Sequence, residues 1–184
     1  MLGPFLIAAT IAAQPTAATE MLGINVPDAF QIGHHQRNDN VEIIELVEPP
    51  ETVENWSKLI TSLMFFDGAK NGLDASYERW RDGLRQTCPS IRETSVRGTV
   101  DGHPAIRATL SCEQNPQTGM PEYLTAFVVQ GDANLMMAQV AFRRSTTPQD
   151  TSLIERIADS LKVCDQTTLD VCSERKPTGF QAGK

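Results

Sequence analysis

Residues 93–112 read ETSVRGTVDGHPAIRATLSC, and residues 123–143 read YLTAFVVQGDANLMMAQVAFR. In both stretches, apolar and polar residues alternate in two runs on either side of a short turn. In the first, Asp101-Gly102 provides the two residues that tolerate the backbone angles of a tight hairpin loop. In the second, the turn is Gly-Asp-Ala-Asn at residues 131–134. The two hairpins predict an antiparallel meander of four strands, over residues 93–100, 105–112, 123–130 and 135–143.

One amphipathic helix is expected before this meander and one after it. The first is predicted to begin at a cap on Asp74 and to run to about Gln86. The second opens at Thr147-Pro148, with proline in its first turn, and ends near Lys162. A single apolar stripe on each helix indicates that each lies on a sheet. The stripes comprise Leu73, Tyr77, Trp80 and Leu84 in the first helix, and Leu153, Ile154, Ile157 and Leu161 in the second.

Two further strands are predicted upstream, over residues 30–37 and 41–47, joined by a turn at residues 38–40. The apolar spacing in residues 51–66 fits either a helix or a strand, and we favour a short turn at Asn55-Trp56 followed by a strand. The fold class predicted from this order is α+β, a mostly antiparallel sheet with two helices packed on one face.

The start of the chain resembles an export signal. Residues 2–13 are apolar and uncharged, too short a run to span a membrane but typical of a signal-peptide core. Thr16-Ala17-Ala18 supplies small residues of the kind that a signal peptidase reads. We therefore expect a periplasmic or secreted protein with no stable membrane anchor. The predicted domain organisation is a signal peptide at 1–18, an N-terminal extension at 19–29, one α+β domain at 30–165 and a C-terminal tail at 166–184, expected to be mobile from Pro177 on.

Four cysteines follow the leader, and an even number in an exported chain favours disulfides. If all four are bridged, three pairings are possible. We favour Cys88 with Cys112, which ties the end of a helix to a strand, and Cys164 with Cys172, which staples the tail. The spacing matches neither a zinc site nor a Cys-x-x-Cys redox motif.

The formal net charge of −7 argues against nucleic acid and anionic lipid as partners. No cofactor motif is present. His34 and His35 are adjacent on a predicted strand and point to opposite faces, so they do not form a joint metal site. His103 lies in a predicted turn, and the chain lacks a Gly-x-Ser-x-Gly motif. No catalytic residue is assigned.

An acidic series follows the first predicted strand. Its members are Glu42, Glu45, Glu48, Glu51 and Glu54. Such a series imitates a cation site, but it lacks the alternating Asp-x-Asp-x-Asp-Gly order of a calcium loop. A solvated strand edge is the favoured interpretation.

The order of elements resembles the Mog1/PsbP-like fold. Three segments also resemble a family of small uncharacterised exported bacterial proteins: residues 51–56 with Thr61, residues 112–122, and residues 139–144. The fold resemblance implies an accessory or adaptor role, and it carries no catalytic residue with it.

The residues that point to a partner or ligand surface are Arg107, Asn115, Glu122, Arg143 and Arg144. The arginines could bind a carboxylate or phosphate through forked hydrogen bonds, or simply pair with the acidic surface. The segment from Cys112 to Glu122 could be a recognition loop, or only turn chemistry between two strands. The favoured function is a non-enzymatic exported accessory protein that binds an envelope protein or a small ligand. The alternatives are an exported hydrolase whose site is assembled from distant residues, and an inhibitor of an envelope enzyme.

Overall fold

The computed structural model describes residues 20–165, 172 and 174–183, so the predicted signal peptide lies outside the described residues. The elements in chain order are β1 (Glu20–Gly23), β2 (Gln31–Arg37), β3 (Val41–Val47), β4 (Lys58–Phe65), the 3-10 helix η1 (Gly68–Asn71), α1 (Leu73–Thr87), β5 (Arg92–Val100), β6 (His103–Cys112), β7 (Glu122–Gln130), β8 (Leu135–Phe142), α2 (Pro148–Ser160), β9 (Lys162–Asp165) and β10 (Gln181–Ala182).

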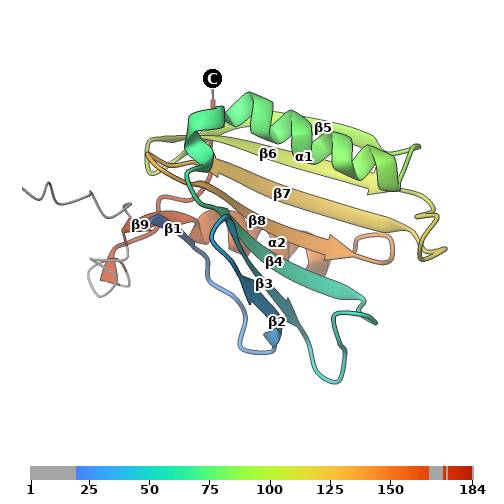
Figure 1. Ribbon diagram of the computed structural model, residues 1–184. Helices are drawn as coiled ribbons and strands as arrows, with labels where there is room; N and C mark the ends of the chain where they lie inside the picture. Colours follow the sequence, from blue (N-terminus) through green and yellow to red (C-terminus); the bar gives the residue numbers. More distant parts are fainter. Residues whose placement is uncertain (1–19, 166–171, 173, 184) are drawn as a thin grey trace, which may run out of the picture.

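The main sheet has the strand order β10-β5-β6-β7-β8-β4-β3-β2 and is antiparallel throughout (Figure 1). The predicted meander forms β5 to β8, and the predicted N-terminal hairpin forms β2 and β3. The ambiguous stretch at 51–66 contains strand β4, which joins the hairpin to the meander by pairing with both β3 and β8. The α+β fold class is confirmed.

The two helices lie on opposite faces of the sheet, so the prediction that both pack on one face was wrong. In Figure 1, α1 lies in front of the sheet and α2 behind it. Phe127 of β7 packs in one core cluster with Ile157 of α2, whereas its neighbour Val128 packs in the other with Tyr77 of α1. Successive strand residues point to opposite faces, so each face of β7 needs its own cover.

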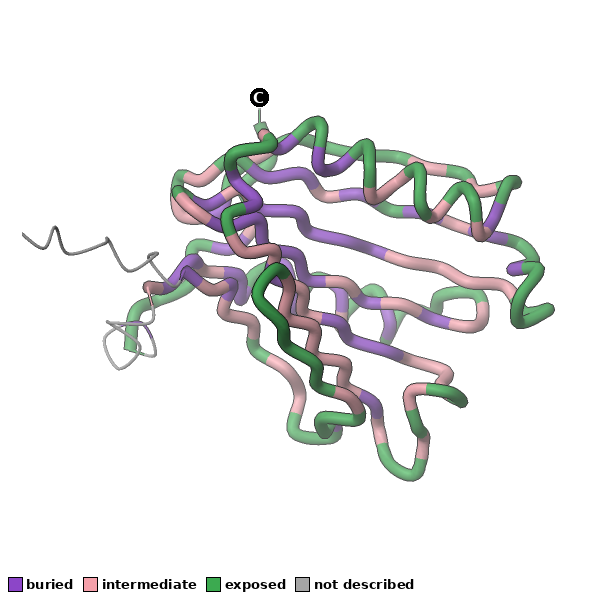
Figure 2. The backbone as a smooth tube through the Cα atoms, viewed as in Figure 1, coloured by how far each residue is buried: buried purple, intermediate pink, exposed green. Residues whose placement is uncertain are grey.

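The apolar runs of β7 and β8 are continuous rather than alternating. Both strands are buried along most of their length, as Figure 2 shows for the centre of the sheet. A continuous apolar run is the sequence signal of a strand buried on both sides. This signal in residues 124–129 and 135–138 could have placed the helices correctly.

The helix starts differ in how closely they follow the prediction. α2 begins as expected at Thr147, whose hydroxyl accepts a hydrogen bond from the Asp150 backbone N–H while the Asp150 carboxylate accepts one from the Thr147 N–H. α1 is capped by Gly72, with φ of 77°, rather than by Asp74. Asp74 lies in the first turn instead and pairs with Arg97 of β5, at 2.6 Å.

The N-terminal segment is joined to the core through Glu20. Glu20 is 6% exposed, and its carboxylate accepts hydrogen bonds from the backbone N–H groups of Asp132, Ala133 and Asn134, at 2.8, 2.9 and 3.0 Å. A side chain at Gly131 would lie 2.4 Å from this carboxylate, so the turn needs glycine there. β1 also pairs with β9, and residues predicted as an extension thus contribute to the domain.

The end of the chain is also held by the sheet, contrary to the expectation of a mobile tail. β10 pairs with β5, and the ring of Phe180 lies 6.1 Å from that of Phe127, between centroids. Gly98 of β5 makes this approach possible, because a Cβ there would lie 2.1 Å from the carbonyl oxygen of Gln181. The glycine at position 98, within a predicted strand, was the sequence signal for this close approach.

Both predicted disulfides are present. Cys88, the residue that follows α1, is bonded to Cys112 at the end of β6, and Cys164 of β9 is bonded to Cys172. The first bridge closes a sequence separation of 24 residues and the second a separation of 8. Both therefore restrict the unfolded chain, the first more than the second.

Replacing Cys88 and Cys112 together by alanine is expected to lower the free energy of unfolding by about 3 kcal/mol, because the longer loop is released. Urea unfolding monitored by circular dichroism measures the loss. The matched control is the double replacement of Cys164 and Cys172, which should cost less. A larger loss from the second pair would contradict the loop-length explanation.

Glu20→Ala leaves three N–H groups of the β7–β8 turn without their acceptor. The expected cost is about 2 to 4 kcal/mol of unfolding free energy, the range for buried donors that lose a charged partner. Glu78→Ala, on the exposed side of α1, is the control and should change stability by less than about 0.5 kcal/mol. Equal effects of the two changes in thermal denaturation would show that the Glu20 contacts do not hold β1.

Candidate functional site

α1 covers only part of its face of the sheet. Tyr77 and Trp80 pack with Ala126 and Val128 of β7, while no helix covers the same side of β8, β4, β3 and β2 (Figure 1). We call this uncovered half the open face. Residues directly opposite each other in neighbouring strands point to the same side, which identifies its members. They are His34 and Gln36 of β2, Val41, Ile43 and Glu45 of β3, Leu59, Thr61, Leu63 and Phe65 of β4, and Met137, Gln139 and Ala141 of β8. Of these, Met137, Thr61 and Leu59 are buried, at 0%, 7% and 8% exposed.

A row of polar side chains crosses the middle of the open face. Gln139 lies opposite Thr61, Thr61 opposite Glu45, and Glu45 opposite His34. We call these four residues the polar rung. Apolar rows border it on both sides. They are Met137, Leu63 and Ile43 on one side, and Ala141 and Leu59 on the other.

A pocket lies where the open face meets α1. It has a volume of about 240 Å³ and a largely apolar lining that includes Phe65, Trp80 and Met137. The lining also contains the hydroxyl group of Ser76 and the guanidinium group of Arg79. Among the described residues, its lining contains no histidine or carboxylate, so the pocket offers Ser76 no general base.

Arg107, a predicted surface residue, is engaged within the protein. Its guanidinium donates two hydrogen bonds to the Glu155 carboxylate of α2, at 2.6 and 3.1 Å, and lies 5.5 Å from the centre of the Phe127 ring. The hydrogen bonds from Arg107 lower the pKa of Glu155. Arg107 thus fastens α2 to the sheet.

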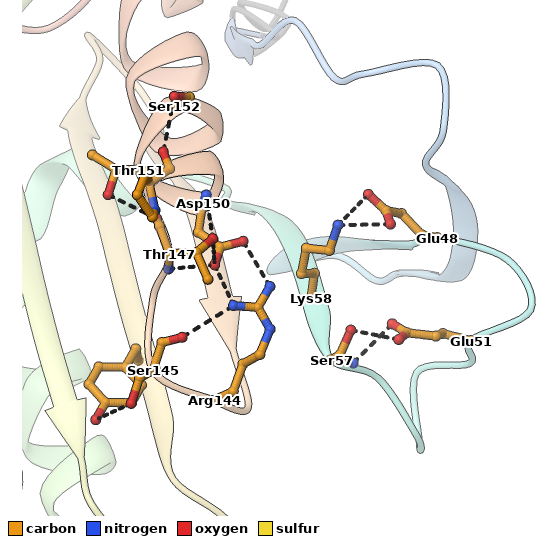
Figure 3. A network of polar contacts seen from close by, with 12 residues as sticks. Glu48, Glu51, Ser57, Lys58, Arg144, Ser145, Thr147, Asp150, Thr151 and Ser152 are labelled. Atoms are coloured by element: carbon orange, nitrogen blue, oxygen red, sulfur yellow. Dashed lines mark hydrogen bonds and ion pairs between the residues drawn. The ribbon is translucent and has the colours of Figure 1, made fainter.

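Arg144 is likewise paired, at the start of α2 (Figure 3). It donates to both oxygens of the Asp150 carboxylate, which also accepts from the backbone and side chain of Thr147. Burial by itself raises the pKa of Asp150, but the hydrogen bonds from Arg144 and Thr147 outweigh it and bring the pKa to about 2. This carboxylate is therefore ionised throughout the neutral range.

Arg143 lies on the other side of the sheet from Arg144. Its guanidinium stacks over Trp56, 4.1 Å from the ring centre, and donates to the carbonyl oxygen of Glu54 at 3.1 Å. Its Nε lies 3.5 Å from Glu122, and this nitrogen has no hydrogen-bond partner among the described residues. The structure therefore separates Arg143 from the other two predicted arginines.

Asn115 organises the loop between β6 and β7. Its side-chain oxygen accepts from the Gln117 N–H at 2.9 Å, and its carbonyl oxygen accepts from the Gly119 N–H at 2.7 Å. Asn115 is 5% exposed and lines a small cavity with Glu122 beside the Cys88–Cys112 bridge. The structure thus places Asn115, Glu122 and Arg143 at one end of the α1 side. Binding of an anion by the three arginines stays a prediction.

The open face was missed from the sequence. His34 and Glu45 were interpreted separately, as an edge histidine and as one member of an acidic series. Their register across β2 and β3 depends on the irregularity after Ile32, where the pairing shifts by one residue. A β-bulge of this kind changes which residues share a face. Gly33, an isolated glycine within a predicted strand, was the sequence signal for it.

The chain matches no family model and no curated protein. Among solved structures it is similar to LpqN of Mycobacterium tuberculosis, described as involved in cell envelope biogenesis, with 10% identity, a TM-score of 0.46, and coverage of 79% of this chain and 84% of LpqN. It is also similar to PA94 of Pseudomonas aeruginosa, a protein of unknown function and putative regulator, with 14% identity, a TM-score of 0.40, and coverage of 73% and 89%.

A third similar structure is the T6SS immunity protein TplEi of Pseudomonas aeruginosa, complexed with a peptide. The identity is 14%, the TM-score is 0.41, and the match covers 77% of this chain and 58% of TplEi. Membership of the Mog1/PsbP-like group stays a prediction.

Asp150→Asn tests the electrostatics at the start of α2. Since the folded-state pKa lies near 2 and the ordinary value is 3.8, the ionised carboxylate stabilises the fold above about pH 4, and this contribution disappears as the pH falls towards 2. The variant should lose about 2 kcal/mol at pH 7 and much less near pH 2. Urea unfolding across this pH range measures both values.

Asp159→Asn on the exposed side of the same helix is the matched control, with an expected change within about 0.5 kcal/mol. A loss in Asp150→Asn that is equally large at pH 7 and pH 2 would show that the carboxylate's charge is not responsible.

Proposed function

We propose that this protein is an exported, non-enzymatic accessory protein of the cell envelope, and that it binds a partner protein or a small apolar ligand on the open face. The observation that carries this proposal is a set of apolar side chains on the open face that α1 leaves partly exposed. They are Leu63 and Phe65 of β4 and Ile43 of β3. On the α2 side of β4 and β8, Ile60, Met136 and Val140 are each 0% exposed. Apolar side chains left uncovered beside a pocket are typical of an interaction site.

The covalent structure supports the proposed compartment. Two disulfides join all four cysteines, and disulfides of this kind form and persist in oxidising compartments. No described helix is long and apolar enough to cross a membrane. The acidic net charge of −7 favours partners that are neutral or basic at the point of contact.

The arrangement of charged groups also supports binding over chemistry. Arg107 and Arg144 are occupied by carboxylates that hold α2, and Arg143 is stacked on Trp56. The pocket beside the open face is lined mainly by apolar side chains. A surface of this composition contributes affinity by burying apolar area.

Site-specific photo-crosslinking in cells of the host organism tests the proposed surface. Ile43 and Ile44 are adjacent in β3 and both partly exposed, but only Ile43 lies on the open face. With p-benzoylphenylalanine in place of Ile43, we expect a discrete crosslinked product that mass spectrometry can identify. The matched protein with the crosslinker at Ile44 should give little or none. Equal products at the two positions, or none at Ile43, would contradict binding on the open face.

A further inference from the structure

We propose that Glu45 receives a cationic side chain, and that the open face binds a partner segment in which a lysine or arginine lies between apolar residues. This inference rests on the proposed function and specifies the chemistry of the partner. The argument depends on which carboxylates of the acidic series are already paired, and on what surrounds the one that is not.

Four members of the acidic series have partners within the protein. Glu42 pairs with His35 and Arg37, Glu48 with Lys58, Glu51 with Ser57, and Glu54 with Thr52. Figure 3 shows two of these contacts, Glu48 with Lys58 and Glu51 with Ser57. Their roles are thus to hold β2, β3 and the β3–β4 loop together.

Glu45 differs from them in both pairing and surroundings. Its carboxylate makes no hydrogen bond or ion pair with any residue in the described part of the chain. It is only partly exposed, and its neighbours along the same face of β3 are the apolar residues Ile43 and Val47. A partly desolvated charge attracts a counter-ion more strongly than a fully solvated one. Glu45 therefore gains more from an external cation than a surface glutamate does.

The residues around Glu45 specify the remainder of the contact. Gln139 continues the polar rung, and its side-chain oxygen can accept a further N–H donor from a bound ammonium or guanidinium group, whereas Thr61, between Gln139 and Glu45, is only 7% exposed. Leu63 and Ile43 lie in the apolar row beside it. A partner that seats a cation on Glu45 therefore needs apolar side chains on either side of it, since a polar flank would be desolvated without compensation.

Charge complementarity is the reason to prefer such a segment over a purely apolar ligand. Lys58 and Arg37 lie on the other face of the sheet, where Glu48 and Glu42 engage them, so they do not neutralise Glu45. A neutral hydrocarbon on the open face would bury this carboxylate unpaired, at a cost that opposes binding. A lysine or arginine removes that cost.

The test uses a phage-displayed random peptide library selected on the mature, disulfide-bonded protein at physiological salt. We expect the enriched peptides to share one basic residue flanked by apolar residues. On Glu45→Gln the preference for a basic residue should be lost, and on Glu45→Lys it should change to aspartate or glutamate. A synthetic copy of the most enriched peptide should bind Glu45→Gln about tenfold more weakly in calorimetry.

Glu42→Gln is the matched control, because it removes the same charge from the same strand on the opposite face of the sheet. If the net acidity of the protein alone attracts basic peptides, both variants will lose the preference equally, and the proposal fails. The thermal stability of Glu45→Gln should be unchanged or higher, since no internal partner is lost. A marked fall in its melting temperature would also overturn the proposal, by showing a structural role.

The same experiment separates this inference from the proposed function. Enriched apolar peptides without a basic residue, whose binding is abolished by Ile43→Glu on the open face, would refute the cation and leave the surface standing. Enriched peptides that bind Ile43→Glu as tightly as the original protein would refute the open face itself. A selection with no enriched peptide counts against both.

Discussion

Apolar side chains cover both faces of β7 and β8, and this constraint places the other elements. Phe127 and Val128 are adjacent and both fully buried, yet they point to opposite sides of the sheet. Exposing either apolar side to solvent would be unfavourable, so α2 covers one side and α1 covers part of the other. The open face is a consequence of this division, because α1 lies over β5, β6 and β7 and does not extend over β4 and β3.

The two ends of the chain complete the α2 side. Glu20 binds three N–H groups of the β7–β8 turn and brings β1 against β9, while Phe180 packs on Phe127 where Gly98 leaves room. The Glu20 contacts join segments that lie far apart along the chain, with a sequence separation of 114 between Glu20 and Asn134. The contacts at both ends close the core cluster on the α2 side and leave the α1 side without comparable cover.

The charged side chains also differ between the α2 side and the open face. Arg107 and Arg144 are paired with carboxylates on α2, which makes them part of the packing between helix and sheet. Glu45 lies on the uncovered side, with no described partner. A protein that pairs most of its central charges internally, and leaves one carboxylate among partly exposed apolar residues, has a surface suited to a basic, apolar partner. The disulfides suit the oxidising compartment in which we expect that partner.

Local signals in the sequence determined the two helices and the strands β2 to β8, but not β1, β9 or β10. Asp101-Gly102 defined a hairpin, Thr147-Pro148 began α2, and the spacing and number of the cysteines led to the observed bridges. Turn chemistry, capping and helical periodicity depend on neighbours within a few residues, so they can be inferred without a structure. Tertiary structure alone decided which face each helix covers, how Glu20 and Phe180 are held, and that Glu45 shares a row with Thr61 and His34. These features depend on strand register and on contacts between distant segments, and a shift of one residue in register moves a side chain to the other face.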